Sequence, residues 1–207
     1  MSRVRILLIL VLFVTGFKAA LAQGQHRRAQ NRGLSIGERL PEIELKTIDG
    51  KTIDLQDVLK ERPVVLETGS YTCPVFRSHV RGMEKLYQEF KDRVAFFIVY
   101  TPEAHPRDVP SYFSGRMMKS RLSADKDKDQ ARSYEERVDT AGSCIADMRI
   151  TIPVLVDNMN NEVTELLGTA PNAAYLIDQN GKIIARYGWL DVSALEQDLK
   201  ALSSVTR

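Results

Sequence analysis

Residues 63–76 of the chain, PVVLETGSYTCPVF, decide the fold. The first residues of this stretch predict a buried strand that ends in a Gly-Ser turn. Pro74 then suits the first turn of a helix, where its missing N–H is not needed. Beyond Pro74, apolar side chains recur at steps of four and three as far as Phe90, which predicts an amphipathic helix. The stretch is therefore a strand, a turn and a helix, with Cys73 at the helix N-terminus.

A second apolar run, at residues 94–100, follows this helix and predicts a neighbouring strand of a parallel sheet. Strand, helix and strand form a βαβ unit, which is almost always right-handed. The charge run at 119–132 is interpreted as a solvated loop or helix end and not as a binding site. Patterns elsewhere predict hairpin strands at 43–48 and 52–55, strands at 152–156 and 173–177, a hairpin partner at 182–187, and helices at 133–148, 161–167 and 191–199. We predict an α/β fold, a central mixed sheet flanked by helices, with an insertion around 102–150.

The first 22 residues have the order of features of a secretory signal peptide, with two arginines, an apolar run and an Ala-Leu-Ala cleavage site. The apolar run is shorter than the ~20 residues that span a bilayer, and an uncleaved membrane anchor is the alternative. Removal of residues 1–22 takes away three basic residues and no acid, so the net charge changes from +2 to −1. This charge gives no case for nucleic-acid binding. We expect an exported protein, periplasmic or secreted, with a flexible linker at 23–36, one domain at 37–207 and no stable membrane span after cleavage.

Cys73 and Cys144 are the two cysteines of the chain. At a helix N-terminus the unpaired N–H groups and the helix dipole favour a thiolate, and Arg77 lies near enough along the helix to add positive charge. A small buried core cysteine is the alternative for Cys73. An oxidising compartment would allow a disulfide between the two cysteines, although two are too few for a disulfide scaffold. The cysteines and the three histidines have no zinc-ligand spacing, so we expect no metal.

Residues 168–172, GTAPN, precede the strand at 173–177 and an Asp-x-Asn-Gly hairpin turn. This order is similar to the cis-proline segment of thioredoxin-like proteins, in which the proline faces the redox cysteine and shapes the substrate surface. The resemblance implies a thioredoxin-like fold in which Pro171 lies near Cys73. An ordinary trans proline at the start of a strand is the alternative.

Three further segments resemble the iodothyronine deiodinases and their bacterial relatives: GSYTCPVF at 69–76, VYTPEAHP at 99–106 and VDNMNN at 156–161. The resemblance extends from about residue 63 to residue 189. It implies that Cys73 stands where the family has its nucleophile, which is usually selenocysteine. The chain also departs from related redox proteins: it has cysteine, a weaker nucleophile than selenocysteine, at the nucleophile position. Phe76 and Arg77 stand where a C-x-x-C or C-x-x-x-C motif has its second cysteine. Cys144 does not align cleanly with the accessory cysteines of the family.

The candidate catalytic residues are expected at one edge of the sheet. Cys73 and His105 each follow one of two strands that we expect to be parallel neighbours, and α/β folds build their sites at that edge. His105 is then a proton donor or a partner of the thiolate, with a surface histidine as the alternative. Among the other candidates, Glu103 and Tyr100 would orient His105, and Thr72 and Ser70 would hydrogen-bond near the sulfur. Substrate would contact Pro171, Phe76 and Arg77. Cys144 is either a resolving cysteine or a buried helix residue.

These features predict an oxidoreductase that reductively dehalogenates an iodinated aromatic, as the resemblance to the deiodinases implies. Its expected partners are a small aromatic substrate and an external thiol reductant, without a bound cofactor or nucleic acid, and a homodimer is a candidate assembly. Ser70 and Cys73 also fit the S/T-x-x-C spacing of peroxiredoxins, so a thiol peroxidase is an alternative, although Leu66 stands where those enzymes have a proline. A non-enzymatic exported redoxin module that binds a partner through the Pro171 surface is the third hypothesis.

Overall fold

A mixed seven-stranded sheet organises the part of the chain that the computed structural model describes, which is residues 33–205 without 121–122, 124–125 and 169. β3 and β4 are parallel, as are β4 and β5, whereas β6 is antiparallel to β3 and β1 is antiparallel to β5. The order across the sheet is β2-β1-β5-β4-β3-β6-β7. The strands are β1 (Glu44–Thr47), β2 (Thr52–Asp54), β3 (Val64–Gly69), β4 (Ala95–Tyr100), β5 (Val154–Val156), β6 (Ala174–Ile177) and β7 (Ile183–Tyr187).

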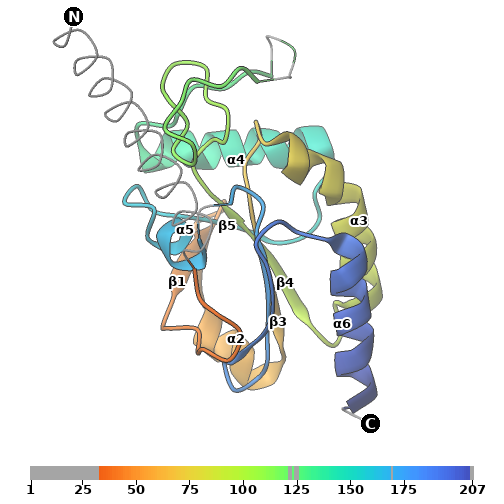
Figure 1. Ribbon diagram of the computed structural model, residues 1–207. Coiled ribbons are helices and arrows are strands. Elements are labelled where there is room, and N and C mark those ends of the chain that lie inside the picture. Colours follow the sequence, from red (N-terminus) through yellow and green to blue (C-terminus); the bar gives the residue numbers. More distant parts are fainter. Residues whose placement is uncertain (1–32, 121–122, 124–125, 169, 206–207) are drawn as a thin grey trace, which may run out of the picture.

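Helices cover both faces of this sheet and one of its ends. In Figure 1, α3 and α6 lie together on one side of the sheet and α4 runs across the end at the top. The helices are α2 (Leu55–Glu61), α3 (Pro74–Phe90), α4 (Tyr134–Met148), α5 (Glu162–Leu167) and α6 (Val192–Val205). The predicted α/β architecture with a mixed central sheet is confirmed.

The side chains of β3 divide between two apolar clusters, one on each face of the sheet. Val65 packs with residues of α3 and α6 such as Met83 and Leu195. Val64 and Leu66 belong to the opposite cluster, with residues of α2 and α5. Because both faces are covered, the strand is apolar at successive positions rather than at alternate ones. Burial of each such side chain contributes about 1.5–3 kcal/mol to folding.

The structure differs from the expected elements at two places and agrees with them in the insertion. Helix α2 was not expected; Asp54 caps it by accepting a hydrogen bond from the N–H of Gln56 at 2.8 Å. Helix α6 continues to Val205, beyond the expected end at residue 199. In the described part of residues 102–133 the chain forms loops and turns without a regular helix or strand, and α4 follows as predicted.

The predicted signal peptide and most of the predicted linker lie outside the described residues. Residues 33–36 of that linker are described, and Leu34 packs against the apolar cluster that contains α2 and α5. Gly33 has φ +120°, and a Cβ there would lie 2.6 Å from the Tyr175 hydroxyl. Within the described ranges, none of the helices combines the length and apolar character needed to cross a membrane.

Candidate active site

Cys73 lies at the start of α3, just after the end of β3. The Cys73 N–H donates to the Ser70 carbonyl at 3.1 Å and closes the turn between the two elements. Cys73 is the N-cap residue, and its sulfur accepts a hydrogen bond from the N–H of Phe76 at 3.5 Å. Pro74 occupies the first helical turn, where it leaves no N–H unpaired. The predicted placement of the cysteine at a helix N-terminus is confirmed.

Burial, however, opposes the thiolate that this placement predicts. Cys73 is only 1% exposed. Burial raises the pKa of the Cys73 thiol, the N–H groups of Phe76 and Val75 lower it, and the charges of Glu103 and Glu67 raise it again. The expectation that the helix terminus alone favours the thiolate is therefore wrong, because desolvation of the charged form outweighs the hydrogen bonds.

The guanidinium of Arg77, which was expected to add positive charge near Cys73, contacts Asp147 and Tyr71. Its guanidinium lies 3.4 Å from the Asp147 carboxylate and 5.0 Å above the Tyr71 ring. The Lys128 ammonium lies 5.3 Å from the same ring, and Lys126 pairs with Asp147 as well. These contacts connect α3, α4, the turn before Cys73 and the insertion, so Arg77 holds the walls of the site together in this structure.

The turn before Cys73 is bonded to the loop that follows β4 through a buried carboxylate. Glu103 Oε2 accepts from the Thr72 N–H at 2.8 Å and from the Thr72 hydroxyl at 2.6 Å. The same hydroxyl oxygen accepts from the N–H of His105 at 3.0 Å. Thr72, the residue before Cys73, is therefore the link between Glu103 and His105.

Tyr100 and Ser70 complete this connection. The Tyr100 hydroxyl donates to Glu103 Oε1 and accepts from the N–H of Tyr71 at 3.1 Å. The Ser70 hydroxyl accepts from the N–H of Ala104 at 3.1 Å. Burial raises the pKa of Glu103, and the hydrogen bonds from Thr72 and Tyr100 oppose that shift. Because β3 and β4 are paired in parallel, both loops leave the same edge of the sheet, as predicted.

Two predicted roles near the sulfur are wrong for this structure. The Thr72 hydroxyl donates to Glu103 and the Ser70 hydroxyl accepts from the Ala104 N–H, whereas the Cys73 sulfur accepts from the Phe76 N–H. Phe76 is fully buried, and a Cβ on Gly69 would lie 2.3 Å from its ring. The Phe76 side chain therefore packs into the core, and its contribution to the site is the backbone N–H that reaches Cys73.

Pro171 lies beside the end of β3 but has a different isomer from the one expected. The structure contains no cis peptide bond among its described residues, so the Ala170–Pro171 bond is trans and the cis-proline interpretation is wrong. The Thr68 hydroxyl contacts the carbonyls of Ala170 and Ala173, each at 3.3 Å, and accepts from the Ala173 N–H at 2.9 Å. These bonds fix the position of the buried Pro171 at the edge of the sheet that also carries Cys73.

Comparison with known proteins decides the family. The family model for iodothyronine deiodinase matches residues 10–194. The chain belongs to the iodothyronine deiodinase family. It is 28% identical over 150 residues to the type I iodothyronine deiodinase of Xenopus laevis, covering 72% of this chain and 55% of the relative. It is 35% identical over 133 residues to the type II iodothyronine deiodinase of Sus scrofa, covering 60% and 45%. The chain thus spans about half the length of these curated relatives.

Bacterial and structural relatives agree on the fold of this deiodinase-family chain. The thioredoxin-like protein YneN of Bacillus subtilis is 25% identical over 178 residues, which cover 86% of this chain and 84% of that protein. The thioredoxin domain of a thiol-disulfide oxidoreductase from Bacteroides vulgatus has a TM-score of 0.55 at 18% identity, covering 81% of this chain and 99% of that chain. A yeast mitochondrial 1-Cys peroxiredoxin also has a TM-score of 0.55, at 16% identity, covering 84% and 78%. The fold is thioredoxin-like.

The deiodinase-like segment at 156–161 has a structural role in this family member. Asp157 accepts from the N–H groups of Val163 at 3.1 Å and Thr164 at 2.8 Å, and from the Thr164 hydroxyl at 2.6 Å. The buried Arg137 donates to the Asp157 carbonyl at 3.1 Å and to Asn161 Oδ1 at 2.9 Å. This segment therefore caps α5 and fixes its connection to β5.

Cys144 is a buried residue of α4 and belongs to the same apolar cluster as Cys73. Both cysteines are free thiols in the structure. The Cys144 sulfur lies 3.8 Å from the Met148 sulfur, and burial strongly raises the pKa of the Cys144 thiol. The buried-helix alternative describes its environment, and its role as a resolving cysteine stays a prediction.

A buried glutamate that the sequence patterns did not single out lies on the α3 side of β3. Glu67 is fully buried, and its Oε1 accepts from Asn172 Nδ2 at 2.8 Å. Asn172 Oδ1 in turn lies 2.9 Å from His79 Nδ1. The sequence did contain a signal for this group, a glutamate inside an otherwise apolar strand. Because glutamate is almost never fully buried without a partner, its position predicts a buried hydrogen-bond partner.

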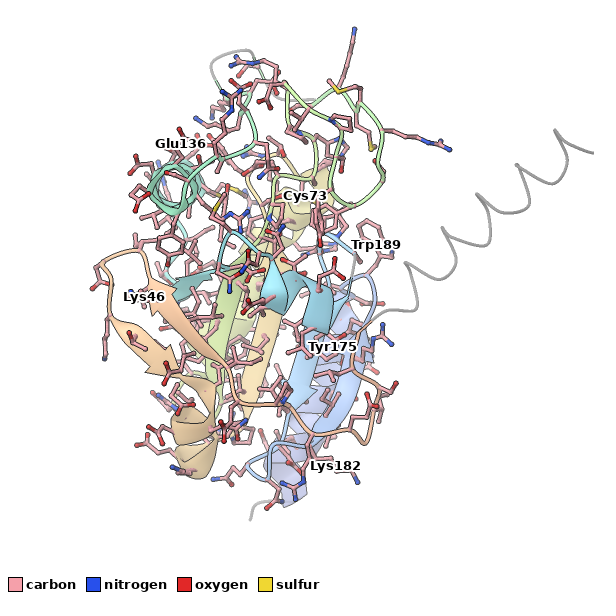
Figure 2. The ribbon with its side chains drawn as sticks, turned by 90° about the vertical axis from the view of Figure 1, so that its left-hand side faces the viewer. Lys46, Cys73, Glu136, Tyr175, Lys182 and Trp189 are labelled. Atoms are coloured by element: carbon pink, nitrogen blue, oxygen red, sulfur yellow. The ribbon has the colours of Figure 1, made fainter. Side chains whose placement is uncertain are left out.

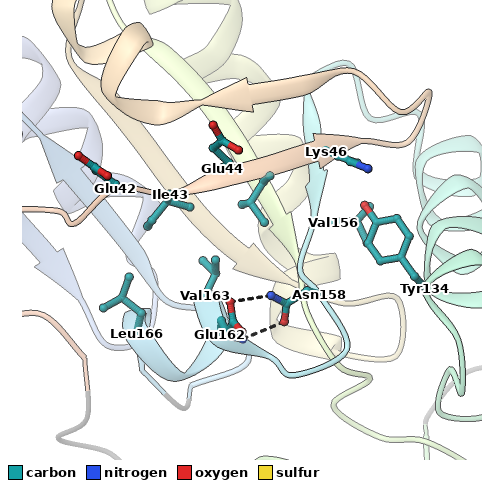
Figure 3. Close-up of a pocket in the computed structure, with 11 residues that line it drawn as sticks. Glu42, Ile43, Glu44, Lys46, Tyr134, Val156, Asn158, Glu162, Val163 and Leu166 are labelled. Atoms are coloured by element: carbon teal, nitrogen blue, oxygen red, sulfur yellow. Dashed lines mark hydrogen bonds between the residues drawn. The ribbon is translucent and has the colours of Figure 1, made fainter.

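A groove of about 400 Å³ lies away from this network, between β1 and α5 (Figure 3). Asn158 Nδ2 donates to Glu162 Oε2 at 2.8 Å within it. Its lining residues are distinct from those that contact Cys73, and include Ile43, Val163 and Leu166. Figure 2 shows Cys73 at the opposite side of the molecule from Lys182, beneath the loops that follow β4. This groove is therefore separate from the hydrogen bonds around Cys73.

Proposed function

We propose that this chain is a thiol-dependent oxidoreductase that reductively removes iodine from an aromatic ring, with Cys73 as nucleophile. One observation supports the proposal most directly: Cys73 is the N-cap of α3, the position to which the resemblance to the deiodinases assigns the nucleophile, and the loop of Glu103 and His105 is hydrogen-bonded to its turn. Sheet and helix hold both loops, so the reacting groups are positioned before substrate arrives.

The proposed reaction has two stages. The Cys73 thiolate attacks iodine, the carbon–iodine bond breaks, and the ring carbon takes a proton, which gives the deiodinated arene and a sulfenyl iodide on Cys73. A thiol, either Cys144 or an external one, then displaces iodide to form a disulfide with Cys73, and external thiol reduces that disulfide to release Cys73 as a thiolate. The arene gains two electrons and the two external thiols are oxidised to one disulfide, so no bound cofactor is needed.

His105 is the proposed proton donor to the ring. Its backbone is fixed by the bond from its N–H to Thr72, and it is half-buried at the edge that carries Cys73. An imidazole can supply a proton near neutral pH. Glu103 is the positioning residue of this arrangement, because it accepts from Thr72 in the turn before α3 and from Tyr100 at the end of β4.

An aromatic substrate requires the site to open, since Cys73 is 1% exposed. The contacts of Lys128 and Arg77 with Tyr71, together with the Lys126–Asp147 ion pair, hold the insertion over the turn. These are partly solvent-exposed interactions, which are individually weak. We propose that movement of this part of the insertion admits substrate, with Pro171 and the rest of the edge forming the contact surface.

Thiol peroxidase activity is the second candidate, and the enclosure of Cys73 favours it. Peroxide is small enough to reach a buried thiol without a large opening. The Cys73 thiolate would attack one peroxide oxygen and become a sulfenic acid, the other oxygen would leave as an alcohol or water, and two external thiols would return the sulfenic acid to a thiol with release of water. The Ser70-x-x-Cys73 spacing is compatible with this reaction.

The remaining proposals concern the context of the enzyme. We propose export by residues 1–22, either periplasmic or secreted, and an external thiol as reductant. Cys144 is the proposed resolving cysteine, and its burial means that α4 or the Cys73 turn must move before the two sulfurs react. A homodimer stays a prediction for solution measurement.

The test measures iodide release from an iodothyronine by the purified chain with excess dithiol. We expect release that is lost in Cys73→Ser and slowed in Cys144→Ser when the dithiol is limiting. Peroxide consumption is measured on the same samples. Iodide release equal in wild type and Cys73→Ser would overturn the proposal. Peroxide consumption without iodide release would establish the peroxidase, and neither activity would favour a non-enzymatic binding module.

A further inference from the structure

The loops at the Cys73 end of the sheet carry most of the large apolar side chains that are exposed in the described residues. β3, β4 and β5 are parallel, and β7 runs in the same direction because β6 is antiparallel to both β3 and β7. The loops that follow β4, β5 and β7 therefore leave this end. They hold six of the eight exposed large apolar side chains of the described ranges, and these six form the loop surface: Val109, Tyr112, Met117, Met118, Met159 and Trp189. Apolar side chains gathered in this way mark an interaction surface, whereas scattered ones need no explanation.

The insertion after β4 presents its part of the loop surface from a fixed loop. Phe113 packs against the apolar cluster that contains residues of α3 and α4. The neighbouring Tyr112 hydroxyl donates to Glu165 of α5. Met117 is nevertheless 59% exposed, and Met118 is exposed as well. In Figure 1 the insertion stands above the end of the sheet, so these methionines project from the body of the protein.

Cationic side chains border the two methionines. Arg116 and Lys119 flank them in the sequence, and both are exposed. Other cations of the insertion contact acids or an aromatic ring: Arg107 with Asp129, Arg132 with Asp108, Lys126 with Asp147 and Lys128 with Tyr71. Apolar side chains beside lysine and arginine suit the boundary of an anionic bilayer, where the apolar groups enter and the cations meet the headgroups.

The residues that precede the described part of the chain begin beside the same loops. A Cβ on Gly33 would lie 2.7 Å from the carbonyl oxygen of Leu167, the last residue of α5, which is also the helix that Tyr112 contacts. Residues 1–32 contain six basic residues and no acid, and residues 23–32, which remain after the expected cleavage, contain three arginines. Ten extended residues reach at most about 35 Å. An anionic surface that meets the insertion is therefore within reach of this basic segment.

We propose that the loop surface binds the surface of an anionic lipid bilayer, with the Cys73 end of the molecule facing the lipid. Methionines, a tyrosine and a tryptophan from three separate loops enter the headgroup region, where aromatic residues with a polar group are favoured. A bilayer adapts to separate loops, whereas a second copy of the chain would need a matching, closely packed surface. An apolar aromatic substrate would then reach Cys73 from the lipid, and this consequence, unlike the binding itself, rests on the proposed function.

Trp189 provides a direct readout, because it is the only tryptophan of the chain and is 50% exposed. The full chain is titrated with vesicles of phosphatidylglycerol and phosphatidylcholine, and in parallel with vesicles of phosphatidylcholine alone. We expect the anionic vesicles to shift the Trp189 emission to shorter wavelength, and lipids brominated on their acyl chains to quench it. Added salt should weaken the response, because it screens the attraction between the basic side chains and the headgroups. Flotation of the vesicles measures binding of the whole chain, including any contribution from residues 1–32.

Substitutions on the loop surface should weaken this response. Met117→Ser combined with Met118→Ser should raise the lipid concentration at half-maximal shift by at least about tenfold, and Arg116→Gln by about fivefold. Ile36→Ser is the matched control, because Ile36 is 64% exposed and its neighbour Gly37 bonds the Ile183 carbonyl, near Lys182 at the opposite end of the molecule (Figure 2). This control should bind as wild type does, and urea unfolding shows whether each variant is folded.

Several outcomes would overturn the proposal. An unshifted Trp189 would do so, and if the chain still floats with the vesicles, binding belongs to residues 1–32 alone. Equal weakening by the methionine changes and by Ile36→Ser would also exclude a specific loop surface. A shift that depends on protein concentration without lipid would identify a second copy as the occupant. None of these measurements uses iodide release, so failure of the membrane proposal and failure of the proposed dehalogenation are distinguishable.

Discussion

The buried Glu67 should make the stability of the protein fall as the pH rises, and Glu67→Gln should remove this effect. An unfolded glutamate has a pKa near 4.5, whereas burial in the folded chain raises the pKa of Glu67 to about 8. Between these values the folded state binds more protons than the unfolded state. Stability is therefore fully present below pH 4.5 and is lost progressively as the pH approaches 8.

The magnitude follows from the size of the shift. Each pKa unit corresponds to about 1.4 kcal/mol, so a shift from 4.5 to about 8 amounts to about 5 kcal/mol across the whole window. Glutamine keeps the size of the side chain and its acceptor for Asn172, but does not titrate. At pH 5 the two proteins should have similar stability, and by pH 8 the variant should be the more stable one by several kcal/mol.

Urea unfolding at pH 5, 6, 7 and 8 measures this difference. With a slope of about 2 kcal/mol per molar urea, the midpoint of wild type relative to Glu67→Gln should fall by about 2 M over the series. Glu89→Gln should follow wild type, because this glutamate is exposed. A difference between wild type and Glu67→Gln that stays constant from pH 5 to pH 8 would refute the argument that Glu67 is a neutral, desolvated acid.

Three substitutions test the packing and hydrogen bonds of the site by the same unfolding assay. Thr72→Val removes a hydroxyl that donates at 2.6 Å and accepts at 3.0 Å, and should cost about 2–4 kcal/mol, whereas Thr140→Val, which loses one exposed bond within α4, should change stability by less than about 1 kcal/mol. Gly69→Ala places a Cβ 2.3 Å from the Phe76 ring and should cost about 1–3 kcal/mol through overpacking; an unchanged midpoint would contradict that packing. Asp157→Ala removes three hydrogen bonds from the first turn of α5 and should cost about 2–4 kcal/mol, with amide exchange faster in that turn than in α3.

The arrangement of strands and helices around Cys73 could be predicted because its signals are local. Apolar runs and the spacing along α3 follow directly from the sequence, and the short connections leave few ways to join them. Helix α2 was missed because the alternation of β2 continues into Leu55, so the strand pattern concealed the capping residue Asp54.

The electrostatics of the site depended on contacts that the sequence does not encode locally. A cysteine at a helix N-terminus indicates a lowered pKa only while the thiol stays in contact with water, and Cys73 is buried in the folded chain. The hydrogen bonds of Thr72 and Glu103 join loops 31 residues apart, and those of Glu67 and Asn172 join positions 105 residues apart. Which oxygen meets which donor is fixed only when the sheet brings these loops together.

The role of Asp157 changes what a match to this family tells an investigator. The segment around it is among the most recognisable parts of the sequence, yet in the structure its hydrogen bonds serve the start of α5. A chain that kept this segment and lost Cys73 would preserve the architecture and still be recognised as a relative after its chemistry had gone. If Cys73 acts as proposed, sorting such sequences into enzymes and inactive descendants depends on the turn before α3 and the loop after β4 rather than on Asp157.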